Sequence, residues 1–197
     1  MNQHEYNEFE KLNDGYIASF FFLRKFANLI KMNRPKRILG MGTIPYSVSG
    51  LRHTFEYVGT EMLDFCKDRL KINAPFVRLY KDVSEVSGKF DLIVVDGRDK
   101  DTNKLPSMLN RNGIILVEAD RREQVETIKR SATRKYVVYR KRPFSLHKSP
   151  GYTIFRFDPG ILDYIDFIAG WTWYKIKTHS AFWINRLLRR SKPVRSV

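Results

Sequence analysis

Two glycines and one acidic residue within residues 36–61 have the types and the spacing of a nucleoside-binding site. Gly40 and Gly42 directly follow a short apolar run, and their lack of a side chain lets the backbone turn tightly and approach a ligand closely. Glu61 lies 21 residues after Gly40, at the end of the next apolar run. A carboxylate at the tip of that neighbouring strand can accept hydrogen bonds from a ribose diol. The alternative is that the glycines only form a tight turn between two buried strands.

Two further acidic residues, Asp82 and Asp96, follow expected strands. Residues 76–80 alternate in polarity and end shortly before Asp82, whereas residues 90–95 (FDLIVV) form a continuous apolar run that ends at Asp96. A run of that kind is typical of a strand buried on both faces of a parallel sheet. An acid at the carboxyl end of such a strand points into the ligand crevice. The alternative for Asp96, which precedes Gly97, is ordinary turn chemistry.

Four carboxylates that follow the two most buried strands could together supply oxygen ligands for a hard divalent cation. They are Asp96, Asp99, Glu118 and Asp120. Such a cation would orient a hydroxyl group and lower its pKa. The alternatives are solvated loop carboxylates and, for Asp120 with Glu123, a helix capping box. The histidines (His4, His53, His147 and His179) show no spacing typical of metal ligands.

An α/β sheet is needed to position these residues. Strands are expected at 37–39, 57–60, 76–80, 90–95 and 114–117, with helices at 62–71, 105–109 and 121–131 and a turn at Asn112-Gly113. This alternation predicts parallel strands in one open sheet. Residues 135–140 and 152–157 are strands with no helix between them, so they should pair antiparallel. A helix over residues 16–32 is expected to cover the sheet edge.

Five parallel strands closed by an antiparallel hairpin resemble the Rossmann-like, class I S-adenosylmethionine-dependent methyltransferases, and the resemblance covers residues 34–158. It implies S-adenosylmethionine as the cofactor. It also implies roles for five residues: Gly40 and Gly42 in the first cofactor motif, Glu61 on the ribose, Asp82 on the adenine amino group and Asp96 facing the methionine moiety and the substrate. The sequence departs from the class where Ile44-Pro45 replaces the usual third small residue.

A narrower resemblance is to the glucuronoxylan 4-O-methyltransferase family, and it is carried by FDLIVVDG and IILVEADRREQVE. Members of that family have a glycine pair without a third glycine, an acid after the fourth strand and a D-x-D-R pattern after the fifth. Glu118, Asp120 and Arg121 match the last pattern. The resemblance implies a glycan sugar hydroxyl as the acceptor. We expect Asp96 to orient the acceptor or its metal, with Glu118 and Asp120 supporting it.

Composition and charge limit the possible partners. The 197 residues suit one domain with a sizeable core, and the single cysteine, Cys66, excludes an internal disulfide framework. Residues 1–13 are polar and show no signal peptide, so we expect a cytoplasmic protein. The net charge is +15, and half of the 36 basic residues but only five of the 21 acidic ones lie in residues 121–197. Such a basic part attracts nucleic acid, anionic lipid or an acidic glycan.

The C-terminal tail differs in composition from the rest of the chain. Residues 161–197 hold all three tryptophans (Trp171, Trp173 and Trp183), and charged residues interrupt them too often for a spanning helix. Aromatic residues beside clustered Lys and Arg are typical of a helix that lies in a membrane interface. The alternative is a helix pair packed on the domain or on a second subunit. We therefore expect three parts: a helical lead-in (1–33), a methyltransferase-like domain (34–160) and a basic tail (161–197).

Three functions follow from these observations. The first is transfer of a methyl group from S-adenosylmethionine to a sugar hydroxyl of a glycan or a lipid-linked sugar, by a protein attached peripherally to an anionic membrane. The second is methylation of RNA, which the basic charge favours. The third is a binding or scaffolding protein on a methyltransferase-like fold without turnover, which Ile44-Pro45 favours.

Overall fold

The computed structural model describes residues 18–42, 55–97, 100–118, 121–141 and 151–165, together with residues 7, 168, 169 and 172. Its contacts divide the chain into two compact units, Met1–Asp158 and Pro159–Val197. The division falls close to the expected start of the tail. The expected boundary at residue 33 lies inside the first unit, between a helix and the strand that follows it. The division into three parts stays a prediction.

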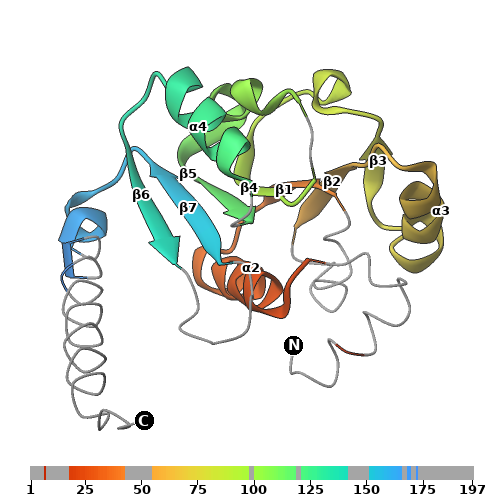
Figure 1. The fold of residues 1–197 in the computed structure, drawn as a ribbon, viewed down its shortest axis with the longest axis horizontal. Coiled ribbons are helices and arrows are strands. Elements are labelled where there is room, and N and C mark those ends of the chain that lie inside the picture. The colour runs from red at the N-terminus through yellow and green to blue at the C-terminus, as the bar shows by residue number, and fades with distance from the viewer. Residues whose placement is uncertain are drawn as a thin grey trace, which may run out of the picture. The chain divides into compact units, whose positions relative to one another are not determined.

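The first unit is built on a seven-stranded sheet with the order β3-β2-β1-β4-β5-β7-β6 (Figure 1). The strands are β1 (Arg37–Met41), β2 (Glu56–Thr60), β3 (Arg78–Tyr80), β4 (Phe90–Val95), β5 (Leu109–Glu118), β6 (Tyr136–Lys141) and β7 (Tyr152–Phe157). The first five strands pair in parallel, β7 pairs antiparallel with β5, and β6 pairs antiparallel with β7. The predicted parallel sheet with a closing hairpin is confirmed. Because β1, β2 and β4 are neighbours, their carboxyl ends meet at one edge of the sheet.

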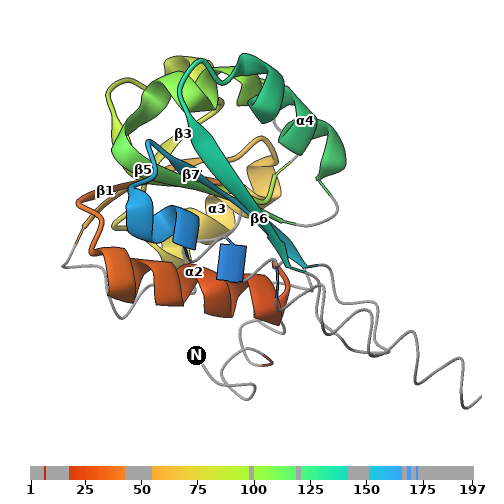
Figure 2. The same cartoon turned by 90° about the vertical axis from the view of Figure 1, so that its left-hand side faces the viewer.

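Helices cover both faces of this sheet (Figure 2). One face carries α2 (Phe20–Asn33), whose Phe22, Phe26 and Leu29 are buried against apolar residues of β1, β4, β5 and β7. Their spacing by four and three residues places them on one side of a helix. The other face carries the short 3-10 helix η3 (Thr102–Met108) and α4 (Arg122–Ser131). Two more helices, α3 (Asp64–Asn73) and η2 (Val83–Glu85), flank β3 along the chain.

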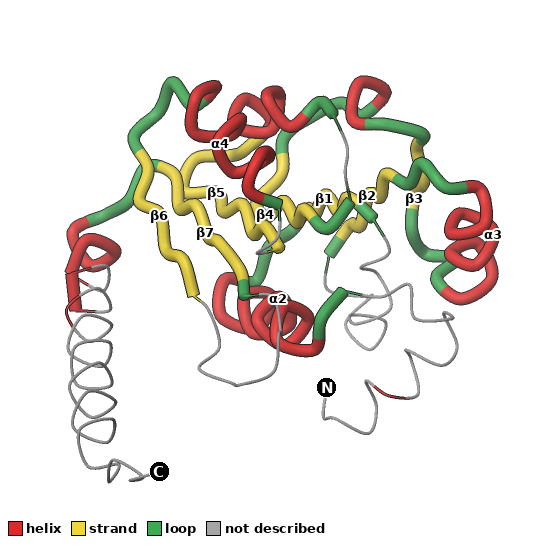
Figure 3. Tube along the Cα trace, viewed as in Figure 1, coloured by secondary structure: helices red, strands yellow, loops and turns green. Residues whose placement is uncertain are grey.

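Two details differ from the sequence prediction. The helix predicted over residues 16–32 begins at Phe20 and packs on a face of the sheet, not on its edge, because its apolar stripe matches the buried side of four strands. The Asn112-Gly113 turn lies inside β5, which runs continuously through it (Figure 3). Asn112 has a φ of 61°, and the pairing of β4 with β5 shifts register between Phe90 and Leu92. The two residues predicted as a turn therefore form an irregularity within the strand.

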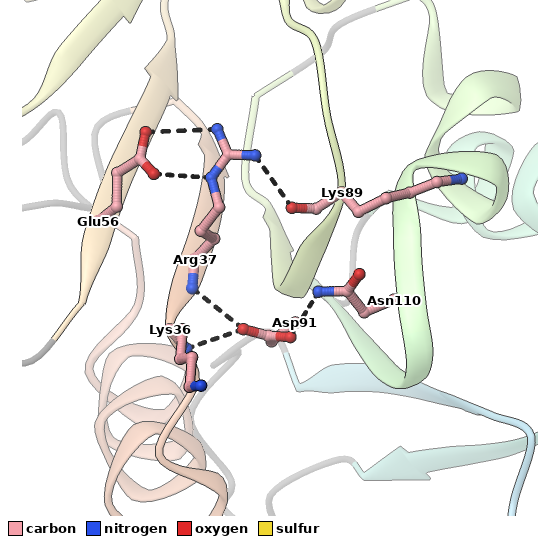
Figure 4. Close-up of polar contacts among 6 residues, drawn as sticks. All are labelled: Lys36, Arg37, Glu56, Lys89, Asp91 and Asn110. Carbon is pink, nitrogen blue, oxygen red and sulfur yellow. Dashed lines mark hydrogen bonds and ion pairs between the residues drawn. The ribbon is translucent and has the colours of Figure 1, made fainter.

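Asp91 ties together the amino ends of β1, β4 and β5 (Figure 4). Its Oδ2 accepts hydrogen bonds from the N–H groups of Lys36 (2.8 Å) and Arg37 (3.1 Å), and its Oδ1 accepts one from the Asn110 side chain (2.7 Å). Partial burial acts to raise the pKa of Asp91, but these hydrogen bonds outweigh it and lower the pKa below 3.8. The carboxylate is therefore charged at neutral pH and fixes the start of three strands.

We expect Asp91→Asn to destabilise the protein by about 1–2 kcal/mol at pH 7, because a charged acceptor with three donors is replaced by a neutral one. Since the folded pKa is depressed, this stabilisation is complete above the usual pKa of 3.8 and is lost as the pH falls through the folded pKa. Urea unfolding at pH 7 and pH 3 measures it, and the difference between the variant and the wild type should narrow at pH 3. Asp68→Asn, which removes an exposed ion pair with Lys71, serves as the control.

The second unit begins with a helical segment. Residues 161–165, 168, 169 and 172 are helical, and Gly160 donates an N–H to the Asp163 carboxylate at 2.9 Å. Three isoleucines in this segment are exposed, Ile161 at 80%, Ile165 at 55% and Ile168 at 59%. Their spacing by four and three residues puts them on one side of a helix. Within the described residues, no helix is both long and apolar enough to cross a bilayer.

Candidate functional site

The carboxyl ends of β1 and β4 are joined through their backbones. Met41 accepts hydrogen bonds at its carbonyl oxygen from the N–H groups of Asp96 (3.0 Å) and Gly97 (2.9 Å). Gly42 has a φ of 97° and donates its N–H to the Thr60 carbonyl at the end of β2 (2.9 Å). A Cβ on Gly42 would lie 2.9 Å from the nitrogen of Gly97. Glycine is therefore required here both by its left-handed backbone and by the close approach of the two loops.

Gly40 makes room for a buried tyrosine. A Cβ at this position would lie 1.8 Å from the hydroxyl oxygen of Tyr57, which comes from the neighbouring strand β2. Tyr57 is 2% exposed, and its hydroxyl has no hydrogen-bond partner within the described chain. Burial raises the pKa of Tyr57 far above 10.0, and the charge of Asp96 adds to the shift, so the hydroxyl stays protonated. The site therefore contains a buried hydroxyl donor that has no partner among the described residues, close to the Gly40–Gly42 turn.

Sequence reasoning did not single out Tyr57. It read the missing side chain of Gly40 as space for a ligand, whereas the tyrosine hydroxyl fills part of that space. The contact depends on the register of β1 and β2, in which Ile38 pairs with Tyr57 and Gly40 pairs with Gly59. Tyr57 thus reaches Gly40 along a diagonal, and only the paired strands reveal this. The only signal in the sequence was an aromatic residue two positions before a glycine in the neighbouring strand.

Glu61 and Asp82 are both held by backbone groups that follow them. Glu61 is 7% exposed at the end of β2, and its Oε1 accepts a hydrogen bond from the N–H of Leu63 (3.0 Å). The Oδ1 of Asp82 accepts the Ser84 N–H (2.6 Å) and also the Ser84 hydroxyl, and so caps η2. The Ser84 hydrogen bonds hold the pKa of Asp82 below its usual value. Each carboxylate keeps a second oxygen in a fixed position at the carboxyl edge.

The loop that contains Asp96 is fixed by the start of α4. Arg121 donates from Nε to the Asp96 carbonyl (2.7 Å), and its Nη2 lies 3.9 Å from Oδ1 of the same residue. Gln124 donates from Nε2 to the Gly97 carbonyl (2.7 Å). The Asp96 side chain is only 12% exposed. Two side chains of α4 therefore position the carboxylate, and Gln124 is a site residue that sequence reasoning missed.

Glu118 lies at the end of β5 and contacts the start of α2. It is 6% exposed, and its Oε1 accepts the N–H of Ser19 at 3.1 Å. The free N–H groups of a helix start carry partial positive charge, which favours a carboxylate there. Glu118 thus joins the end of β5 to α2, and this contact occupies one of its two oxygens.

The rest of the expected metal set lies outside the described residues. Asp99 and Asp120 are not described, and neither are Ile44-Pro45 or the four histidines. Across the residues that are described, no group of three or more His, Cys, Asp or Glu side chains could hold a metal ion. Helix α4 starts with Arg121 as its N-cap, one residue after Asp120. Cys66 is buried in α3.

Comparison with known proteins begins with two negative results: no family model and no curated protein matches the sequence. Solved structures do match. A protein from Staphylococcus aureus, inferred to be a caffeoyl-CoA O-methyltransferase, superposes with a TM-score of 0.57 over 79% of this chain and 93% of its own, at 16% identity. The chain has the Rossmann-like methyltransferase fold.

Two further solved structures agree with this fold. A TehB-like S-adenosylmethionine-dependent methyltransferase from Corynebacterium glutamicum matches with a TM-score of 0.52 over 80% of this chain and 98% of its own, at 17% identity. An inferred rRNA methylase from Clostridium thermocellum matches with a TM-score of 0.53 over 72% and 98% of the two chains, at 17% identity. These matches show the methyltransferase fold and give no support to the narrower glucuronoxylan resemblance.

Proposed function

We propose that the chain is an S-adenosylmethionine-dependent methyltransferase. The observation that carries the proposal is the position of Glu61, buried at the end of β2 with one oxygen bonded to Leu63 and one oxygen left for a ligand, at the same edge as the glycine turn. The residues at this edge of the sheet fit the cofactor. Glu61 would accept from the ribose diol, Asp82 from the adenine amino group, and the Gly40–Gly42 turn would let the ligand approach the backbone.

The cofactor, when bound, supplies a reactive sulfonium methyl group. The chain's own part is to align the acceptor and to exclude water. Asp96 is the best placed residue for this task, because its carboxylate is mostly buried and its loop is held by Arg121 and Gln124. Its charge would orient an acceptor hydroxyl by accepting its hydrogen bond. Glu118 and Asp120 would act in support. A divalent cation at Asp96 is tested by adding a chelator, which should abolish turnover if a cation takes part.

For the acceptor, we propose a sugar hydroxyl of a glycan, because the residues from Glu118 to Arg121 resemble the pattern of the glucuronoxylan family. RNA is the second candidate, favoured by the excess of basic residues after position 120. Transfer of a radiolabelled methyl group to purified acidic oligosaccharides or to RNA separates the two. If neither becomes labelled while the cofactor binds, the scaffold function is favoured.

The cofactor site is tested by calorimetric titration with S-adenosylmethionine and its demethylated product. We expect Glu61→Ala to weaken binding about tenfold or more, because the charged acceptor of the ribose diol is lost. The matched control is Glu56→Ala, which removes a glutamate from the opposite end of the same strand. Absence of binding to the folded wild-type protein would contradict the proposed function, as would equal affinities of the two variants.

We also propose that the tail attaches the protein to an anionic membrane interface. The support is the exposed side of the helical segment formed by Ile161, Ile165 and Ile168, followed in the sequence by seven basic residues and no acidic ones after Asp166. The partition constant for phosphatidylserine vesicles, measured by co-sedimentation, should fall about a hundredfold or more for Ile165→Asp combined with Ile168→Asp, since two buried isoleucines at about 1.5–3 kcal/mol each contribute about 3–6 kcal/mol. Ile72→Asp, on an exposed isoleucine of α3, should have no effect. Equal sedimentation of all variants would rule out this attachment.

A further inference from the structure

A cavity lies at the edge of the sheet opposite Gly42 and Asp96. It has a volume of about 550 Å³ and is lined by the connection from α2 to β1, the first part of β5 and the second half of β7. Because β7 runs antiparallel to β5, Arg156 near its end pairs with Ile114 near the start of the buried part of β5. The cavity is therefore built by the amino ends of the parallel strands. Its volume is within the range of about 300–1,000 Å³ that is usual for small-molecule sites.

Basic residues are the commonest charged residues in the lining of the cavity. Its lining includes four cationic residues, Arg34, Lys36, Arg111 and Arg156, and one acidic residue, Asp91. Both oxygens of Asp91 accept hydrogen bonds from the protein itself, from two backbone N–H groups and the Asn110 amide (Figure 4). The carboxylate is thus already occupied by structural donors, and the cavity keeps an excess of positive charge. Amide side chains of Asn33 and Asn112 add neutral hydrogen-bonding groups to the lining.

Three basic residues of this cavity lack the close ion pairs that many other basic residues in the described part of the chain form. Elsewhere, basic residues pair with nearby acids, as in Arg37–Glu56, Lys67–Asp64, Lys71–Asp68, Lys104–Asp101 and Arg134–Asp158. Among the close ion pairs between described residues, none involves Arg34, Lys36 or Arg111; Lys36 acts electrostatically on Asp91, and Arg111 on Asp158, from farther away. Like charges that converge on one cavity repel one another unless an anion lies between them. The arrangement therefore suits an anionic ligand.

We propose that this cavity binds a small phosphate-bearing molecule of about the size of a nucleotide. Guanidinium groups match phosphate oxygens in a bidentate geometry, and three of the four cations are arginines. The limited volume suits a discrete ligand more than a membrane surface or a nucleic acid duplex, each of which needs a larger contact area. The inference does not depend on the proposed function, because the cavity shares no residue with the carboxyl edge.

The test uses pyrophosphate and uridine diphosphate as probes, because neither contains the adenine that the opposite edge would bind. Calorimetric titration of the full chain should give saturable binding of both probes. We expect Arg34→Gln combined with Arg111→Gln to weaken it about tenfold or more, since two charge-assisted contacts are lost. The matched control is Arg24→Gln combined with Arg130→Gln, which removes the same charge from exposed arginines outside the cavity. Thermal unfolding of both double variants checks that they fold.

Each outcome of this test supports or overturns the proposal. The proposal is supported if only the cavity variant binds the probes more weakly. The affinity of the wild type for the probes should also stay unchanged when the demethylated product of the cofactor is present in excess. Equal weakening by both double variants means that the probes respond to overall charge, and this overturns it. No saturable binding of either probe also overturns it. A single-stranded RNA oligonucleotide or phosphatidylserine vesicles could bind more tightly than the probes. If the cavity variant loses that binding, the proposal of a small ligand is overturned in favour of that polyanion.

Discussion

Gly40→Ala is expected to destabilise the first unit by about 3 kcal/mol, the upper end of the usual cost of overpacking a core. The added Cβ would lie 1.8 Å from the Tyr57 hydroxyl oxygen and 2.6 Å from the ring carbon that carries it. Tyr57 cannot move away easily, because its side chain is buried under the packed face of the sheet. Urea unfolding followed by circular dichroism measures the loss. Cofactor affinity should fall at the same time, because the displaced ring lies beside the glycine turn.

Two comparisons make this prediction specific. Gly59→Ala, at the residue that pairs with Gly40 in β2, should cost less, because its Cβ would meet only the ends of Val77 and Leu79 at 3.0 and 3.1 Å. In a Tyr57→Val background, Gly40→Ala should become much less costly, because the clashing ring is gone. If Gly40→Ala costs the same with and without the tyrosine, the steric explanation is wrong.

Asp96→Asn is expected to lower methyl transfer by about 10²-fold or more, because the acceptor hydroxyl loses the charged group that orients it. Cofactor binding should change little, because asparagine keeps the size of the side chain. The hydrogen bond from Arg121 should also remain, since it ends on the backbone carbonyl of residue 96 and not on the carboxylate. The measurement is the rate of labelled methyl transfer to the active acceptor, together with calorimetric affinity for the cofactor. Asp64→Asn, whose side chain is 93% exposed, is the control.

A contrary result would be equally informative for the site. If Asp96→Asn retains full turnover, the carboxylate does not orient the acceptor, and Asp96 serves mainly to fix its loop. If the variant loses cofactor binding as well as turnover, Asp96 belongs to the cofactor-binding set alone.

The sequence was most informative where one physical requirement dominated. The limits of β4 were predicted at residues 90–95 and were found there, because a continuous apolar run that ends in an acid has few other interpretations. The closing hairpin followed from two β-rich segments with no helix between them. Contacts between distant residues could not be predicted. The contact of Tyr57 with Gly40 depends on strand register, and the hydrogen bond of Ser19 to Glu118 joins residues 99 positions apart.

The position of α2 was predicted less well than its existence. Its apolar residues were dense enough to indicate a helix, but sequence periodicity does not say which surface will cover them. In the structure, they pack on residues that are contributed by β1, β4, β5 and β7. A face assembled from so many segments cannot be inferred from any one of them.

The docking of α2 also has a consequence for synthesis of the chain on the ribosome. The helix is made early, but its surface is completed by Ile114, Leu116, Tyr152 and Ile154, and its start is held by Glu118. At about 5–20 residues per second, Ile154, the last of these residues, follows Ser19 after roughly 7–27 s. During that interval the phenylalanines of the helix have no finished surface to cover, so the nascent chain exposes them to chaperones before the first unit can close.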